Sequence, residues 1–146
     1  MNLISVFNYL TEQDAAGNYV NGGATYNLNT HEFNPKSGYI VSLIGFEKVV
    51  EIPKNLNEWQ TVITQYLGKR GVFDALAEQE NVYLGLWIDG DRLCIDLSER
   101  IDCLGTAMSK GSERKQKAIW DANQGKVIYL YKKVSNDPDI LTDKKY

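Results

Sequence analysis

Residues 82–97, VYLGLWIDGDRLCIDL, constrain this chain more than any other segment, because they predict one β-hairpin. Asp89-Gly90 is a strong turn signal, since a type I′ turn needs positive φ at both central residues and this pair tolerates it well. A turn closed there pairs Leu86 with Leu93 across the hairpin. We therefore expect two antiparallel strands that meet at Asp89-Gly90.

The two faces of this hairpin differ in chemistry. One face is aliphatic and is expected to be core; it carries Val82, Leu84, Leu86, Leu93, Ile95 and Leu97. The other face mixes aromatic, charged and small side chains: Tyr83, Gly85, Trp87, Arg92, Cys94 and Asp96. Tryptophan, tyrosine and arginine dominate binding hot spots, and Trp87 is expected opposite Arg92, where the two could form a cation–π pair. The mixed face is therefore either a contact surface or, if helices cover it, a second layer of core.

Length and charge limit the classes of protein to consider. The chain has 146 residues, 43% of them hydrophobic, which suits one domain with a sizeable core. We expect that domain over residues 1–134, with residues 1–20 loosely packed and 135–146 as a polar tail. A net charge of −3 gives no global basic field. No apolar run is long enough to span a membrane, and the start lacks the pattern of a secretion signal, so we expect a cytoplasmic protein without membrane contact.

Several further segments have helical spacing of apolar residues. The clearest helix begins at Asn55, because Asn55 with Glu58 three residues later is typical of a capping box. Gly68 is expected to end that helix in the left-handed conformation. The remaining expected helices cover residues 2–13, 72–80 and 98–111, the last of them capped by Ser98.

The other regular segments read as strands. Strands are expected over residues 25–28, 39–44 and 48–52, paired in a meander. A second hairpin is expected around Asn123-Gln124-Gly125, with strands at residues 119–120 and 127–131. Strand pairs that alternate with helices predict an α+β fold, a mostly antiparallel β-sheet built from hairpins with two to three helices packed on it.

The preferred functional hypothesis is a non-enzymatic protein-binding module. It would act by steric occupancy of a partner protein and needs no cofactor and no catalytic residue. The Asn- and Tyr-rich region of residues 18–39 is similar in composition to an antibody paratope. The predicted partner-binding residues are Tyr83, Trp87, Arg92 and Asp96 on the hairpin, with Tyr26 and Tyr39.

The alternative hypothesis is a protein that binds or processes nucleic acid. A basic cluster near aromatic side chains could grip phosphates and stack bases; it contains Lys110, Arg114, Lys115 and Lys117. A divalent ion would need oxygen ligands, for which the candidates are Asp89, Asp91 and Asp96. The sequence contains no phosphate-binding loop motif. Binding that weakens steeply with salt would separate this hypothesis from the first.

The reactive residue types are few. His31 is the single histidine, so a histidine-rich metal site is excluded, and its place in a turn favours a solvated residue over a catalytic one. Cys94 and Cys103 are expected to be free thiols, since a cytoplasmic protein rarely holds a disulfide. A cysteine-dependent enzyme remains a third possibility, which Cys94→Ser or Cys103→Ser would test.

Six short segments resemble a family of small accessory proteins that phages and mobile elements encode. They are GGATYNL at 22–28, SGYIVSL at 37–43, GFE at 45–47, LGLW at 84–87, IDLS at 95–98 and QKAIWD at 116–121. None of them is a catalytic motif, so no functional residue is carried over. The resemblance implies a protein that works in the host cytosol by binding a host protein, such as a component of CRISPR or another defence system. Neither the partner's identity nor the oligomeric state follows from it.

Overall fold

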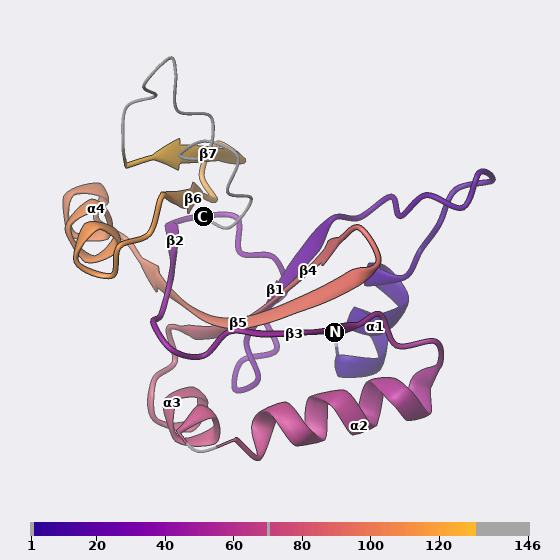
Figure 1. The fold of residues 1–146 in the computed structure, drawn as a ribbon. Helices are drawn as coiled ribbons and strands as arrows, with labels where there is room; N and C mark the ends of the chain where they lie inside the picture. The colour runs from indigo at the N-terminus through magenta and orange to yellow at the C-terminus, as the bar shows by residue number, and fades with distance from the viewer. Residues whose placement is uncertain (1, 70, 131–146) are drawn as a thin grey trace. The chain divides into compact units, whose positions relative to one another are not determined.

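The structure, a computed structural model, describes residues 2–69 and 71–130 and confirms the α+β class (Figure 1). The described chain forms a seven-stranded antiparallel sheet and four helices. The helices are α1 (Leu3–Leu10), α2 (Leu56–Leu67), α3 (Val72–Glu78) and α4 (Leu104–Glu113). The strands are β1 (Gly23–Tyr26), β2 (Tyr39–Ser42), β3 (Lys48–Glu51), β4 (Val82–Asp89), β5 (Arg92–Ile101), β6 (Ala118–Asp121) and β7 (Lys126–Tyr129).

The chain divides into two compact units, which are described separately. The first contains Met1–Asn34 and Gly45–Leu97, and the second contains Pro35–Ile44 and the chain from Ser98 onward. Whether the two units form the single domain expected over residues 1–134 depends on how they associate, so that expectation stays a prediction. The expected tail over 135–146 lies outside the described residues.

The first unit holds four strands in the order β1-β4-β5-β3. β1 pairs with β4, with Gly23 opposite Trp87, and β3 pairs with the first half of β5, with Val49 opposite Cys94. In Figure 1, α2 runs alongside β3, and α3 and α1 lie near the two ends of α2. The expected meander of the first three strands is wrong, because β1, β2 and β3 each pair with later strands and not with one another.

The hairpin predicted over residues 82–97 is present, but its turn lies one residue further along. β4 ends at Asp89 and β5 begins at Arg92, so Gly90 and Asp91 connect them. Gly90 has φ of 64° and neither aspartate has positive φ, which is typical of a type II′ turn. The predicted type I′ turn at Asp89-Gly90 is therefore wrong. Because the turn lies one residue further along, each cross-strand partner changes by two residues, so the predicted pairs Leu86–Leu93 and Trp87–Arg92 are wrong. Every side chain nevertheless keeps its predicted face.

The aliphatic face of the hairpin is core, as predicted. All six of its side chains are at most 2% exposed: Val82, Leu84, Leu86, Leu93, Ile95 and Leu97. The helices add a second set of buried apolar side chains to this unit, which includes Val6, Phe7, Leu10, Trp59, Ile63 and Leu76. The expected loose packing of residues 1–20 is wrong for α1, since Val6 and Leu10 are buried and the indole Nε1 of Trp59 donates to the carbonyl of Leu3 at 3.0 Å.

Local capping chemistry explains where α2 begins. The side-chain oxygen of Asn55 accepts from the N–H of Glu58 at 2.9 Å, and the Glu58 carboxylate accepts from the N–H of Lys54 at 2.7 Å. This confirms the predicted helix start. The predicted left-handed stop at Gly68 is wrong, since Gly68 has φ of −76°. The left-handed residue is Gly71, with φ of 86°, which directly precedes α3.

β5 is shared between the units, and its residues from Ser98 to Ile101 belong to the second. The strand order in the second unit is β5-β2-β6-β7, and α4 packs against β2 and β6. Its core contains Val41, Ile101, Ala107 and Ile119. The predicted second hairpin is confirmed as β6 and β7. The predicted helix over 98–111 is wrong at its start, because Ser98–Ile101 continue β5 and pair with β2, and α4 begins only at Leu104.

Candidate binding groove beside strand β3

Half of the contact surface predicted from the sequence is covered. The six residues fall into three exposure classes: buried Tyr26, Tyr83 and Asp96, half-buried Trp87 and Tyr39, and exposed Arg92. The mixed hairpin face is thus largely a second layer of core. The expectation that Tyr26, Tyr83 and Asp96 meet a partner is corrected, because buried side chains offer a partner almost no area.

The chain's own loop covers two of those tyrosines. The Tyr83 hydroxyl donates to the carboxylate of Glu32, and the Tyr26 hydroxyl lies 2.7 Å from Nδ1 of His31. Burial raises the pKa of Tyr26. Buried Asn27 shapes the loop, since its side-chain oxygen accepts from the N–H groups of Asn29 and Thr30, at 2.8 and 2.9 Å. His31 is exposed at this turn, as predicted.

Part of the basic cluster in the alternative hypothesis is engaged in ion pairs within the protein. Arg114 donates to Oε1 of Glu99 at 2.7 Å, and Nζ of Lys110 lies 3.2 Å from Oε2 of the same carboxylate. Two of the four predicted cations therefore neutralise a nearly buried acid. Lys115 is exposed and Lys117 half-buried. This leaves a weaker basic surface than the sequence suggested.

The predicted metal ligands do not converge. Asp96 is buried, Asp89 is half-buried, and Asp91 is exposed in the hairpin turn. Within residues 2–69 and 71–130, no three His, Cys, Asp or Glu side chains are grouped so that they could hold a metal ion. The alternative metal site at these aspartates is not formed by the described residues.

A groove that sequence analysis missed lies between the end of β3 and the start of α2, within the first unit. It has a volume of about 610 Å³. One wall is formed by the segment from Val50 to Lys54, and the other by Asn57, Glu58, Thr61 and Val62 of α2. Val50, Ile52, Pro53 and Val62 give it an apolar lining.

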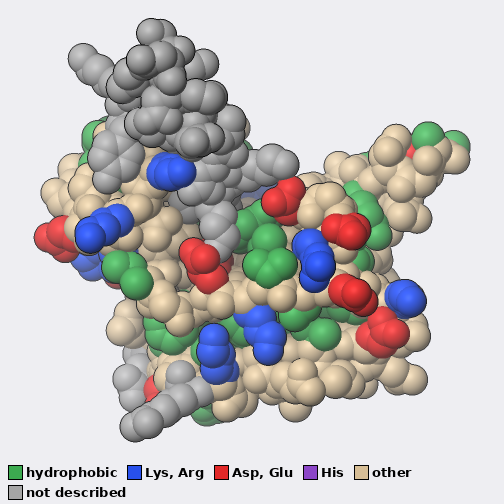
Figure 2. Space-filling view, viewed as in Figure 1, with side chains coloured by type: hydrophobic (Ala, Val, Ile, Leu, Met, Phe, Trp, Pro, Cys, Tyr) green, Lys and Arg blue, Asp and Glu red, His purple; other side chains and the backbone are tan. Residues whose placement is uncertain are grey.

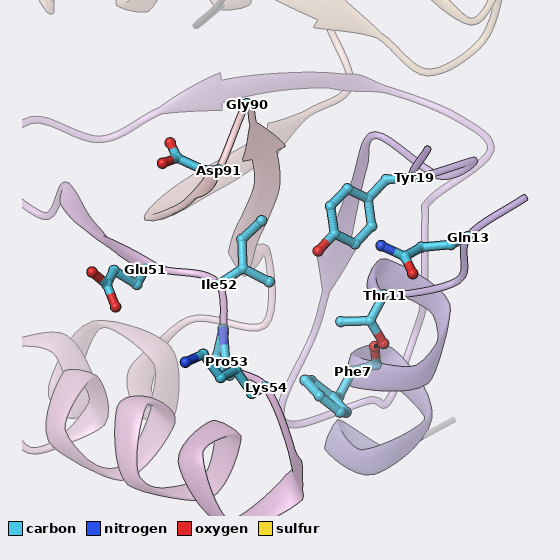
Figure 3. A pocket seen from close by; sticks show the side chains of 10 residues that line it. All are labelled: Phe7, Thr11, Gln13, Tyr19, Glu51, Ile52, Pro53, Lys54, Gly90 and Asp91. Carbon is cyan, nitrogen blue, oxygen red and sulfur yellow. Dashed lines mark hydrogen bonds between the residues drawn. The ribbon is translucent and has the colours of Figure 1, made fainter. Parts of the chain in front are cut away.

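A second cleft, of about 750 Å³, borders the same chain segment (Figure 3). Glu51, Ile52, Pro53 and Lys54 lie on one side of it, and Figure 3 shows Phe7, Thr11, Gln13 and Tyr19 on the other. Gly90 and Asp91 at the hairpin turn complete the lining. The residues 51–54 thus line both cavities, which we call together the β3 groove.

The rim of the β3 groove carries both signs of charge. Lys54 and Glu51 line both cavities, Glu58 lines the first and Asp91 the second. Arg92 stands opposite Glu51 in the sheet and lies 3.9 Å from the Asp91 carboxylate. Figure 2 likewise shows acidic and basic side chains interspersed on the visible face, with hydrophobic patches between them. The groove therefore has no strong field of one sign that would select a polyanion.

Only part of this groove can be predicted from the sequence. The pattern of residues 48–52 predicts a strand, but Val49 and Val50 look like ordinary core valines in the segment KVVEI. In the structure, Val49 is 55% exposed and Val50 is half-buried. The one local hint is that Pro53 ends the strand, since proline within sheets is confined to edges and ends.

Comparison with known proteins finds no match. No family model, no curated protein and no solved structure matches this chain. In the described part of the chain, none of the helices has the length and apolar character needed to cross a membrane.

Proposed function

We propose that this protein is a protein-binding module that uses the β3 groove to hold part of a partner protein. The observation that carries the proposal is that two cavities share the segment of residues 51–54, whose Ile52 and Pro53 give both an apolar part, beside the exposed Val49 of β3. Binding sites of this kind combine an apolar floor with a few polar groups that orient the partner.

Charge balance favours a protein over a nucleic acid as the partner. Lys54 is offset by Glu51, by Glu58 of α2 and by Asp91, which also line the β3 groove. A nucleic-acid surface needs an excess of cations, because phosphate contacts supply most of the affinity. We therefore expect partner binding that changes little with salt concentration.

The resemblance to phage and mobile-element accessory proteins extends this proposal to the kind of partner. On that basis the partner is a cytosolic host protein, such as a component of a defence system, and the module acts by occupying its surface. The extension depends on the resemblance alone, whereas the groove depends on the contacts described above.

Paired variants of α2 test the proposal. Val62 lines the groove, whereas Thr64 lies on the same helix, is exposed and does not line it. Val62→Glu should abolish capture of a partner from host lysate, because a carboxylate then enters an apolar lining. Thr64→Glu should retain it. Circular dichroism confirms that both variants are folded, and equal capture by both would overturn the proposal.

A further inference from the structure

We propose that the open edge of β3 receives an extended segment of the partner protein as an additional strand, with apolar side chains at alternate positions that enter the groove beside α2. This inference rests on the proposed function and specifies how the partner is held. β-strand addition obtains affinity from main-chain hydrogen bonds and specificity from pockets for every second side chain.

The opposite edge of the same sheet shows what a closed edge looks like in this unit. On β1, the carbonyl of Thr25 accepts from the N–H of Asn34 at 2.7 Å, and the N–H of Thr25 donates to the Asn34 side chain at 2.9 Å. Tyr26 forms a further bridge with Phe33. The chain therefore covers the edge of β1 with its own loop, which is a common protection against unwanted strand pairing.

β3 has no such cover among the residues that the structure describes. Its four residues pair with β5 alone, from Lys48 opposite Ile95 to Glu51 opposite Arg92. In an antiparallel pair, every second residue of an edge strand directs both its N–H and its carbonyl away from the neighbour. A row of such donors and acceptors is complementary to another extended peptide backbone. For this reason we expect the ligand of this edge to be an extended peptide segment.

Two residues limit the length of the added strand. Lys48 places a charge at one end of β3, and Pro53, which follows Ile52, lacks the N–H that a ladder needs. Charged residues and proline at a sheet edge discourage long strand pairing and aggregation. The open stretch between them suits a short segment from another protein rather than the edge of a large sheet.

The groove beside β3 sets the side-chain preference of that segment. Val50 of β3 and Ile52, which directly follows the strand, are two positions apart, and both line the groove together with Val62 of α2. An added strand therefore directs every second side chain toward an apolar wall. On the other face, Val49 is exposed and offers a cross-strand contact to a second apolar or β-branched residue.

Short synthetic peptides test this mode of binding on the full-length chain. The probes are capped peptides that alternate valine or isoleucine with threonine, selected from a library by affinity for the ¹⁵N-labelled protein. We expect the backbone amide signals of Lys48–Glu51 to shift on binding, and alternate amides among them to gain protection from hydrogen exchange. N-methylation of the peptide at alternate positions should weaken binding about tenfold or more in one of the two registers, since it removes main-chain donors and keeps the side chains.

The outcomes separate this inference from the proposed function. If the peptides bind at Val62 and both N-methylated registers bind equally well, strand addition is overturned while the groove remains a binding site. If no peptide perturbs β3 although Val62→Glu still abolishes partner capture, strand addition is again overturned and the proposed function stands. If β3 signals change with protein concentration alone and the mass doubles, the occupant is a second copy and the partner segment is overturned.

Discussion

Arg114 and Glu99 form a short charged hydrogen bond, with 2.7 Å between Nη2 of Arg114 and Oε1 of Glu99, although they lie far apart in the sequence. Glu99 is on β5, and its side chain is only 11% exposed. Burial raises the pKa of the Glu99 carboxyl, but the hydrogen bonds and charges of Arg114 and Lys110 outweigh this effect and hold the pKa below its ordinary value. The buried carboxylate is therefore ionised and paired in the second unit.

Removing Arg114 should cost more than removing Lys110. Arg114→Ala should lower the free energy of unfolding by about 1.5–3 kcal/mol, the range for hydrogen bonds to charged groups. Lys110→Ala should cost less, because the Lys110 side chain is 39% exposed and lies 3.2 Å from the carboxylate. Urea denaturation at neutral pH measures both values, and equal losses would contradict the ranking.

The same carboxylate predicts how stability depends on pH. The folded pKa of Glu99 lies below its ordinary value of 4.5, so the unfolded chain takes up the proton first as the pH falls. Its contribution is fully present above that ordinary value and is lost as the pH falls through the folded pKa. Glu99→Gln should therefore be less stable than the wild type at neutral pH, and the difference should shrink under acid. A constant difference at all pH values would contradict this assignment.

Two glycines of α4 should respond in opposite directions to alanine. A Cβ on Gly111 would lie 2.7 Å from Cδ1 of Leu130 and 3.0 Å from Cγ2 of fully buried Ile119. Gly111→Ala should destabilise by about 1 kcal/mol or more, because crowding outweighs the usual gain in helix propensity. Gly105→Ala meets nothing nearer than Sγ of Cys103 at 4.0 Å and should be neutral or stabilising. Thermal denaturation compares the two variants. If both were stabilising, the side chain of Ile119 would have to move aside to make room for the added methyl group.

The hairpin illustrates what local sequence can settle. The alternation of aliphatic residues fixed its core face, and capping chemistry fixed the start of α2 at Asn55. The turn lies one residue beyond its predicted place, because aspartates flank Gly90 on both sides and only glycine adopts positive φ there. A pattern around Asp89 and Asp91 cannot choose between a type I′ and a type II′ turn.

The misassigned elements depend on contacts distant in sequence. Ser98 and Glu99 look like a helix start, but both continue β5 and pair with β2, and Glu99 binds a cation 15 residues further along the chain. Tyr83 looks like a contact residue, but the carboxylate of Glu32 covers its hydroxyl from 51 residues away. The β3 groove depends likewise on which strands pair and on where α2 packs. No local periodicity encodes either property, so the candidate site could not be found from sequence.

Truncation of the aliphatic hairpin face should be costly. Leu86 and Leu93 are 2% and 1% exposed, so Leu86→Ala and Leu93→Ala should each lower the free energy of unfolding by about 2–5 kcal/mol. Arg92→Ala, at the exposed start of β5, should change it by less than about 0.5 kcal/mol. Urea denaturation gives the values, and a small loss at Leu93 would mean that this face is not the core of the unit.

The two cysteines should differ in reactivity. Cys103 is exposed directly before α4, where the neighbouring N–H and hydroxyl of Thr106 and the N–H of Gly105 lower its pKa. Cys94 is buried on β5. Iodoacetamide should therefore alkylate Cys103 first, and mass spectrometry should find Cys94 modified only after unfolding. Thr106→Val should slow labelling of Cys103 near neutral pH. An unchanged rate would show that the Thr106 hydroxyl does not lower the pKa of Cys103.

Tyr66 should contribute to the loss of folding stability at alkaline pH. Its hydroxyl donates to the carbonyl of Phe46 at 2.6 Å, and burial, with the negative charges of Asp96 and Glu47, raises its pKa well above the ordinary value of 10.0. The unfolded chain therefore loses this proton first as the pH rises, so the stabilisation is present below pH 10 and is lost above it.

Tyr66→Phe should cost about 1 kcal/mol at neutral pH, since it removes one hydrogen bond, and should flatten the fall in unfolding free energy above pH 10. Tyr129→Phe is the matched control, because Tyr129 is exposed and its loss should leave the alkaline slope unchanged. Urea denaturation over a series of alkaline pH values compares the three proteins. An alkaline slope that Tyr66→Phe leaves as steep as that of the wild type would place the responsible proton on another group.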